Sequence, residues 1–344
     1  MTEAPVIDVH AHVLTEEMTA RMRKEAPDVG PEMREIDGYG AILRVGAIIQ
    51  KPFPRGGWDL DQRLADMSAA GVDVQVVSPL PQTFLYDLEP NRTAVIAAIQ
   101  NEAIAALVKG LPNKFFGLAT VPLQAPELAA AELERAMCRL DLKGIMIGSH
   151  IEGTNLDHRK LDPVWAKAEE LGACILIHPQ KVAASERLGS YYLKNLIGNP
   201  LDTTIAAASL IFGGVMERFP RLKICLAHGG GYLPYQAGRF IHGWNVRPEC
   251  KKSLPVSPQS AIARFYYDTI LHSPASLVFL IGQMGADRVV LGSDYPFDMG
   301  MLDCVRSVRS LEIPEDQRRK ILRDVPRQLV GGLEAAVGRP DQNM

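Results

Sequence analysis

The first residues of the chain that could do chemistry are two histidines in the stretch VIDVHAH, at residues 6–12. In a β-strand, residues i and i+2 point to the same face, so His10 and His12 share one face, with Asp8 one step behind them. Two adjacent imidazoles can bind one metal ion, or they can be ordinary strand histidines bonded to backbone or water. The pair alone leaves both interpretations open.

The elements that must position this pair follow from the apolar pattern. Short apolar runs predict eight strands, at 6–12, 72–79, 115–121, 143–149, 173–178, 222–228, 265–271 and 288–294. Helical patterns lie near 59–70, 91–110, 125–140, 160–171, 202–217, 232–245, 274–284 and 314–330. Several strands are apolar on both faces, as parallel strands covered by helices should be. Eight strand–helix units favour an α/β fold of the (β/α)8 TIM-barrel type, with a doubly wound open sheet as the alternative.

Three insertions interrupt this alternation. Residues 13–58 follow the first strand, residues 179–201 follow the fifth, and residues 246–262 precede the seventh. The first two are loops at strand C-termini, which build the active site in a barrel. We therefore expect one barrel domain over residues 1–344, with the insertion 13–58 forming part of the active-site cover.

Histidines gather at the predicted strand ends. Of eight histidines in the chain, five lie at strand C-termini: His10, His12, His150, His178 and His228. The last strand ends at Asp294. All these ends meet at one rim of a barrel, so the pattern favours a metal site over scattered core histidines.

Three neutral imidazoles and one carboxylate suit a divalent ion, with Zn²⁺ the expected one. That set leaves a position for water or substrate, and a bound water ionises near neutral pH. The fourth strand has one lysine, Lys143, at the end opposite the rim. A carbamylated lysine that bridges two metals is therefore not expected there, which favours a single ion.

Four motifs together resemble the amidohydrolase superfamily: DVHAH at 8–12, LIHP at 176–179, LAHGGG at 226–231 and LGSDYPF at 291–297. Within it, the chain is most similar to the decarboxylase branch typified by 2-amino-3-carboxymuconate-6-semialdehyde decarboxylase, over residues 6 to 330. The resemblance implies a barrel with one divalent ion, usually Zn and sometimes Mn, on His10, His12, His178 and Asp294. It also implies that His228 is the acid/base residue, and we count Asp294 with it as catalytic.

The same branch holds its acidic substrate with arginines. Arg239 matches one of them, and in the family this side chain enters the neighbouring subunit's site, so the resemblance implies a homodimer. For the arginine of the first loop, Arg55 is the candidate and Arg44 the fallback, because the spacing to Trp58 departs from the family pattern. Phe297 and Tyr191 are further candidates for substrate contact, although residues 191–195 read YYLKN where the family has tryptophans.

These features predict a metal-dependent, non-oxidative decarboxylase (a carboxy-lyase) of a small unsaturated or aromatic carboxylic acid. Loss of CO2 from an sp2 carbon leaves an unstable carbanion, so that carbon must first be hydrated by hydroxide or protonated directly; the residues leave this choice open. The alternative is a hydrolase or hydratase on the same barrel, such as a lactonase. A barrel that binds without catalysis is a third possibility, which the complete ligand set disfavours. An esterase is rejected, because HGGG occurs without a G-x-S-x-G elbow.

The amino-acid composition limits the kinds of molecule that the protein can bind and the cellular compartment in which we expect it. The chain is 47% hydrophobic and 22% charged with a net charge of −3, and it has no basic block, which argues against nucleic acid. Its five cysteines are scattered, without a CxxC pair, as in reduced cytoplasmic proteins. We expect no signal peptide and no membrane span, and a small carboxylate as the partner.

Overall fold

The strands of the barrel occur in the predicted order along the chain. The computed structural model describes residues 4–36 and 40–331. Within them the barrel strands are β1 (Ile7–His12), β5 (Val74–Ser78), β6 (Phe115–Gly117), β7 (Gly144–Gly148), β10 (Cys174–His178), β11 (Lys223–Leu226), β12 (Tyr266–Asp268) and β13 (Val289–Val290). Each lies inside one of the eight predicted runs, so the predicted (β/α)8 fold is confirmed.

Parallel pairing carries the sheet around the barrel. The strands pair in the orders β1-β5-β6 and β7-β10-β11-β12-β13. A parallel bridge between Ala119 and Ile145 joins β6 to β7, and one between Ala11 and Tyr295 joins β1 to the segment after β13. The His12 amide also donates to Tyr295 O at 2.6 Å. The two sheets are therefore the two arcs of one closed barrel.

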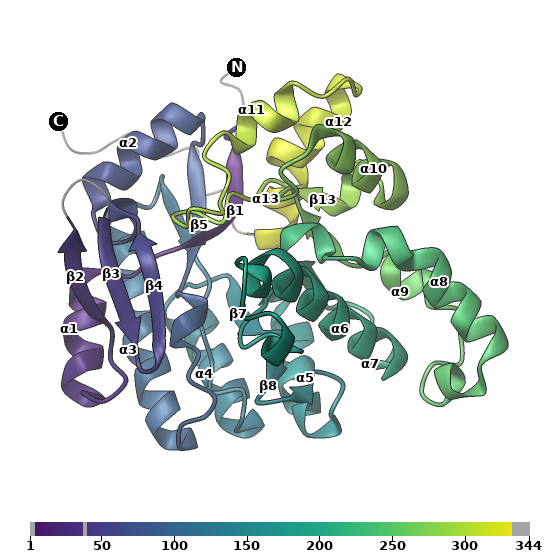
Figure 1. Cartoon of the computed structure of the whole chain (residues 1–344), viewed down its shortest axis with the longest axis horizontal. Coiled ribbons are helices and arrows are strands. Elements are labelled where there is room, and N and C mark those ends of the chain that lie inside the picture. The colour runs from purple at the N-terminus through teal and green to yellow at the C-terminus, as the bar shows by residue number, and fades with distance from the viewer. Residues whose placement is uncertain (1–3, 37–39, 332–344) are drawn as a thin grey trace.

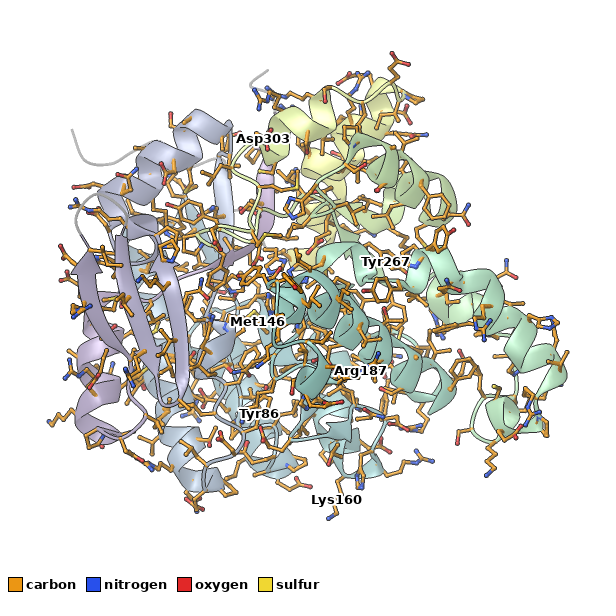
Figure 2. The ribbon with its side chains drawn as sticks, in the orientation of Figure 1. Tyr86, Met146, Lys160, Arg187, Tyr267 and Asp303 are labelled. Carbon is orange, nitrogen blue, oxygen red and sulfur yellow. The ribbon has the colours of Figure 1, made fainter. Side chains whose placement is uncertain are left out.

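The barrel strands are buried on both faces. Every residue of β1, β5, β7 and β10 is buried. Inward side chains fill the barrel and outward ones pack under the helices, so both faces of these strands are buried. Figure 2 shows this contrast: Met146 lies inside the barrel, while Lys160 projects from the outer surface.

Helices surround the barrel, as Figure 1 shows. They are α2 (Leu60–Ala70), α3 (Pro90–Gly110), α4 (Pro126–Arg139), α5 (Asp162–Leu171), α6 (Asn199–Phe212), α7 (Val215–Arg218), α8 (Leu233–Val246), α9 (Gln259–Ile262), α10 (Pro274–Met284), α11 (Cys304–Arg309), α12 (Glu315–Arg319) and α13 (Val325–Val330). Helix α2 begins where the Asp59 side chain accepts from the Gln62 amide and ends at Gly71 in a left-handed conformation. None of the described helices is both long enough and apolar enough to cross a bilayer.

The insertion 13–58 is more ordered than a loop. It contains α1 (Glu16–Glu25) and an antiparallel sheet of β2 (Glu32–Ile36), β3 (Gly40–Val45) and β4 (Ile48–Phe53). Helix α1 packs on α3, and the sheet stands at the side of the barrel (Figure 1). The sequence analysis assigned this whole segment to a loop: β2, which reads EMREI, is largely exposed and polar, and the more apolar β3 and β4 were not recognised as strands.

Candidate metal centre

Four side chains from three parts of the chain meet at the rim of the barrel. His10 and His12 lie at the end of β1, His178 ends β10, and Asp294 follows β13; all four are buried. One ligand atom from each lies within 4.8 Å of the others. Asp294 Oδ1 is 3.0 Å from His12 Nε2, 3.3 Å from His10 Nε2 and 3.7 Å from His178 Nε2. These are the four residues that the resemblance implied as metal ligands.

The spacing of these atoms fits one small cation. Ligands held about 2.0–2.2 Å from a tetrahedral centre lie about 3.3–3.6 Å from one another. The observed separations from Asp294 Oδ1 are 3.0–3.7 Å, and His10 Nε2 lies 3.1 Å from His12 Nε2. His178 Nε2 is buried and has no hydrogen-bond partner among the described residues, as expected of an atom reserved for a ligand. The donor set therefore fits a divalent ion.

Hydrogen bonds at the opposite ring nitrogens orient the three imidazoles. The contacts are His10 Nδ1 to Asp268 Oδ2 at 2.7 Å, His12 Nδ1 to Pro79 O at 3.0 Å, and His178 Nδ1 to Pro179 O at 2.9 Å. Carbonyl and ionised carboxylate oxygens only accept, so each Nδ1 donates. Each Nε2 is then left with a free lone pair that faces the cluster.

Burial and mutual contact shift the pKa values of these groups. Burial lowers the pKa of His178 to about 3. Burial also opposes protonation of His10, but its hydrogen bonds with Asp268 and Asp294 raise its pKa to about 10. Burial would raise the pKa of Asp294, yet hydrogen bonds with the surrounding imidazoles hold it well below its usual range. The Asp294 carboxylate is therefore ionised.

His228 lies beside the cluster without belonging to it. Its Nε2 is 3.4 Å from Asp294 Oδ2, on the carboxylate oxygen that does not face the other three imidazoles. Its ring centroid is 5.2 Å from that of His178, and its Nδ1 is buried without a partner in the described chain. His228 and Asp294 both have a φ of +56°, a backbone conformation that is unfavourable for residues other than glycine.

Glycines after His228 serve close packing. Gly229, Gly230 and Gly231 all have positive φ, and a Cβ at Gly230 would lie 2.6 Å from the Tyr267 ring. A Cβ at Gly231 would lie 2.1 Å from Pro200 O. The HGGG run thus lets the chain turn against β12 and α6.

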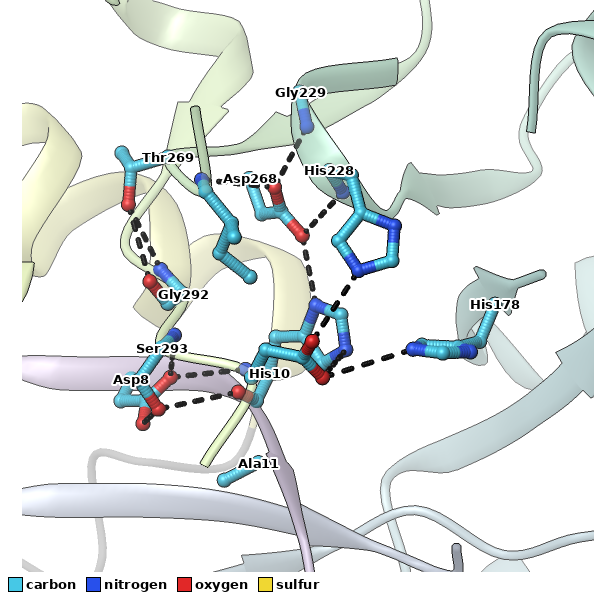
Figure 3. A network of polar contacts seen from close by, with 12 residues as sticks. Asp8, His10, Ala11, His178, His228, Gly229, Asp268, Thr269, Gly292 and Ser293 are labelled. Atoms are coloured by element: carbon cyan, nitrogen blue, oxygen red, sulfur yellow. Dashed lines mark hydrogen bonds and ion pairs between the residues drawn. The ribbon is translucent and has the colours of Figure 1, made fainter. Parts of the chain in front are cut away.

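A buried polar network underlies β1. Arg63 of α2 is 1% exposed and donates to backbone and side-chain acceptors on three elements: Gly56 O, Gln75 Oε1 and His12 O. Its guanidinium lies 4.7 Å from the centroid of the Tyr295 ring. Asp8 takes hydrogen bonds from the same network, including Gln75 Nε2 at 3.1 Å and Ser293 Oγ at 2.5 Å. Asp8 therefore supports the rim and is not one of the four clustered ligands (Figure 3).

Neither candidate arginine lies in the cluster. Arg55 is 68% exposed, and its Nε donates to Asp59 Oδ2 at 2.6 Å. Arg239 is exposed on α8, which projects from the barrel (Figure 1). The fallback residue, Arg44, is exposed on β3, opposite Glu32.

The two candidate aromatic contacts differ in position. Phe297 lies against the cluster, with its ring centroid 5.2 Å from that of His12 and 6.4 Å from that of Phe53 in β4. It also lines a cavity of about 380 Å³. Tyr191 is 88% exposed, whereas burial and the charges of Asp298 and Asp294 raise the pKa of its neighbour, Tyr192. Tyr192 is itself 53% exposed, which makes it the less exposed of the two tyrosines.

Two histidines whose roles the sequence left open lie outside the cluster. His150 Nδ1 accepts from the Gly153 amide and its Nε2 donates to Lys181 O, so it holds a hairpin to the loop after β10. His272 is exposed and lines a separate cavity of about 390 Å³ with Thr269 and Arg306.

Sequence reasoning missed two residues that contact the clustered histidines: Asp268 and Arg63. Asp268 was hidden because the seventh strand was predicted to end at residue 271, whereas β12 ends at Asp268. The rule that strand C-termini face the site would have found it with the correct boundary. Arg63 gave no signal, because an arginine within a helix is usually exposed.

Comparisons with known proteins agree with this geometry. The sequence model of the amidohydrolase family matches residues 7–332. The chain is 36% identical over 330 residues to 2-amino-3-carboxymuconate-6-semialdehyde decarboxylase of Dictyostelium discoideum, covering 92% of this chain and 89% of that protein. It is 30% identical over 353 residues to the enzyme of the same name from Caenorhabditis elegans, with 88% of each chain covered.

Solved structures share the fold. The crystal structure of 5-carboxyvanillate decarboxylase LigW from Sphingomonas paucimobilis superposes with a TM-score of 0.82 at 25% identity, covering 95% of this chain and 99% of that one. A dihydroxybenzoic acid decarboxylase from Polaromonas sp. JS666, solved with bound manganese and the inhibitor 2-nitroresorcinol, gives a TM-score of 0.79 at 22% identity, covering 95% and 97%.

Proposed function

Because the chain belongs to the amidohydrolase family, we propose that it is a metal-dependent, non-oxidative decarboxylase of a small unsaturated or aromatic carboxylic acid. The observation that carries the proposal is the buried His10, His12, His178 and Asp294 cluster with His228 beside it. The decarboxylase names of the relatives support it. The overall reaction exchanges a carboxylate for a proton on one carbon and releases CO2.

We assign one divalent ion to His10, His12, His178 and Asp294. Three imidazoles and a carboxylate favour Zn²⁺, and the manganese in the Polaromonas enzyme makes Mn²⁺ the second choice. When bound, the ion supplies Lewis acidity beside the substrate. The second carboxylate oxygen of Asp294, Oδ2, faces His228 Nε2 and interacts with it electrostatically.

His228 is the residue we assign to proton transfer. Its Nε2 faces Asp294 Oδ2 at 3.4 Å, so the carboxylate can hold a proton on this nitrogen. The substrate carbon that loses CO2 must gain a proton, and this proton needs a positioned donor. His228 is partly buried at the rim, which keeps its proton from exchanging freely with bulk water.

We assign Phe297 and Tyr192 to the walls of the substrate site, with Tyr192 in place of Tyr191. The insertion 13–58 would contribute to the cover through Phe53, whose ring stacks on Trp58 and approaches Phe297. Arg55 would exchange its ion pair with Asp59 for a substrate carboxylate, which a guanidinium can hold by two parallel hydrogen bonds.

We further propose a homodimer in which Arg239 enters the partner's site. Helix α8 and the adjacent α10 expose an aromatic pair, Tyr235 at 76% and Phe279 at 41%, together with Val278 at 44%. Exposed apolar groups of this kind favour a self-complementary contact between two copies. The scattered cysteines, free in this structure, fit the cytoplasm as the compartment.

The experiment is a CO2 assay on the purified, metal-loaded protein. The substrates are 2-amino-3-carboxymuconate 6-semialdehyde and a panel of ortho-hydroxybenzoates, and labelled CO2 and the product are measured together. We expect CO2 release that is lost in His178→Ala. Hydrolysis of a lactone panel without any CO2 release would replace this proposal with the hydrolase alternative.

A further inference from the structure

Asp268 is the last residue of β12, and it is fully buried. We propose that Asp268 is a positioning residue that orients His10 toward the metal and, through its other hydrogen bonds, holds the turn that carries His228. The inference rests on the proposed function only for the role of His228 in proton transfer. Figure 3 shows the carboxylate between the two histidines.

Asp268 accepts four hydrogen bonds, two on each oxygen. Oδ2 accepts from His10 Nδ1 at 2.7 Å and from the His228 amide at 3.0 Å. Oδ1 accepts from the Gly229 amide at 2.8 Å and from the Ile270 amide at 3.1 Å. The carboxylate is therefore saturated by donors from three segments of the chain.

The contact with His10 determines which ring nitrogen is free. An ionised carboxylate has no proton to donate, so His10 Nδ1 must carry the hydrogen. His10 Nε2, which lies 3.3 Å from Asp294 Oδ1, then presents its lone pair to the cluster. His12 Nδ1 contacts the Pro79 carbonyl and lies 3.2 Å from Ser78 Oγ, and His178 Nδ1 contacts the Pro179 carbonyl, so His10 is the clustered histidine whose orientation depends on a carboxylate.

The contacts with the turn act on His228. His228 and Gly229 both have positive φ, +56° and +62°, and their successive amides converge on the same carboxylate. Adjacent backbone N–H groups in such a turn form a small concave site for an anion. Asp268 fills that site and stabilises a backbone conformation that His228 would otherwise avoid.

An asparagine at position 268 cannot reproduce this arrangement. If its NH2 replaces Oδ1, it faces two amide donors and leaves the Gly229 and Ile270 N–H groups unpaired. If its NH2 replaces Oδ2, one amide is left unpaired, and His10 Nδ1 becomes the acceptor. The second orientation leaves fewer donors without a hydrogen bond. However, it places the hydrogen of His10 on Nε2, so that this nitrogen has no lone pair with which to bind the metal. Metal binding must then drive the side chain into the less favourable orientation.

Asp8 provides a matched control. It is also fully buried and also accepts four hydrogen bonds, from the His10 amide, the Ser293 amide, Ser293 Oγ and Gln75 Nε2. None of its donors is an imidazole. Asp8→Asn therefore tests the general effect of neutralising a buried carboxylate in this network, without changing which nitrogen of His10 carries the hydrogen.

The experiment compares Asp268→Asn, Asp8→Asn and the unmodified chain, each stripped of metal and titrated with Co²⁺. We expect Asp268→Asn to bind Co²⁺ roughly 10–100-fold more weakly, the usual effect of losing a carboxylate partner of a metal-bound histidine. Its Co²⁺ visible spectrum should also change. Asp8→Asn should lose much less Co²⁺ affinity than Asp268→Asn and keep the Co²⁺ spectrum of the unmodified chain, because no imidazole bonds its carboxylate, although both variants should unfold at lower temperature.

Two results would overturn the proposal. One is an unchanged Co²⁺ affinity and spectrum in Asp268→Asn. The other is an equal loss of affinity in Asp8→Asn, which would reduce Asp268 to a structural role. Because Asp268→Asn can fail to fold, the tautomer of His10 is also read in the unmodified, Zn²⁺-loaded chain by ¹⁵N NMR of the imidazoles, with a hydrogen on Nδ1 expected and a hydrogen on Nε2 contradicting the proposal.

These readouts are separate from the decarboxylase assignment. If the chain releases no CO2 from any substrate but Asp268→Asn still loses Co²⁺ affinity selectively, the proposed function fails and the positioning role stands. If CO2 release is found and the two asparagine variants bind Co²⁺ equally, the proposed function stands and the positioning role of Asp268 fails.

Discussion

The two ends of the barrel strands have opposite chemistry. At the amino ends, buried apolar residues such as Ile7, Phe115 and Ile145 fill the base. At the carboxyl ends, imidazoles and carboxylates are buried within a few ångströms of one another, as at His178 and Asp294. Stability and chemistry are therefore separated along each strand, because apolar packing stabilises the base while buried charges at the rim need a ligand to balance them.

The largest expected effect comes from removing a rim ligand. His178→Ala should lose the metal and all detectable decarboxylation, because the cluster loses one of four donors. The fold should survive, since the Nδ1 of His178 bonds only a backbone carbonyl. Metal content by mass spectrometry, CO2 release and circular dichroism check these expectations together. A variant that keeps its metal would show that His178 is no ligand.

The next largest effect separates proton transfer from metal binding at the same rim. His228→Ala should retain the metal but lose on the order of 10²–10⁴ in kcat, the usual contribution of a positioned general acid. His178→Ala is the matched control, because it removes the same side chain from the same rim. If His228→Ala is isolated without metal, His228 is itself a ligand and the assigned role is wrong.

A substitution at the base of the barrel should reduce the stability of the fold and leave metal binding intact. Phe115→Ala removes a fully buried ring at the start of β6 and should destabilise the fold by about 3–5 kcal/mol. Metal content of the folded fraction should be unchanged, because the cavity lies at the opposite end of the barrel. Urea unfolding and metal analysis on the same samples provide the measurement. A loss of metal without loss of stability would contradict the separation of the two ends.

A smaller effect on catalysis is expected for Arg239, which lies on α8 and belongs neither to the base nor to the rim of the barrel. Arg239→Ala should reduce kcat/KM roughly 10–100-fold, because a charged hydrogen bond to a carboxylate contributes about 1.5–3 kcal/mol. The decisive test mixes Arg239→Ala with His178→Ala after reversible dissociation. A shared site predicts that hybrid dimers recover activity, since one of their two sites combines an intact cluster with an intact arginine. No recovery in verified hybrids would end the shared-site proposal.

The smallest effect is expected on the outer surface. The Arg21 guanidinium, hydrogen-bonded at 2.7 Å, lowers the pKa of Glu102 in α3 below its usual 4.5. A lowered pKa means that this carboxylate stabilises the fold above its unfolded-state pKa, and that this contribution is lost as the pH falls through the folded-state value. Glu102 is 39% exposed, so Glu102→Gln should destabilise the fold by less than about 1 kcal/mol at pH 7. Urea midpoints should differ from the unmodified chain at pH 7 and converge at low pH; a difference that grows on acidification would reverse the assigned sign.

Apolar patterning was enough to predict the barrel and a group of histidines at its rim, while the resemblance of four motifs selected His10, His12, His178 and Asp294 among them. Strand periodicity located all eight strands, because parallel strands buried on both faces leave continuous apolar runs. Histidines at the ends of those runs then pointed to one rim, since parallel strands in a barrel end on the same side. His10 and His178 could be placed together in this way although 168 residues separate them in the chain.

The surroundings of those residues follow from tertiary contacts, which the sequence pattern does not give. Hydrogen bonds between distant segments depend on strand boundaries and loop paths, which local patterns do not encode; a predicted strand that overran by three residues was enough to hide Asp268. The burial of Arg63 likewise depends on acceptors from three separate segments. Tyr191 and Tyr192 differ in exposure, 88% against 53%, although they are adjacent and identical residues in the loop after β10. These features arise from contacts between residues far apart in the chain. Such contacts stabilise the protein only after the barrel has closed and brought those residues together.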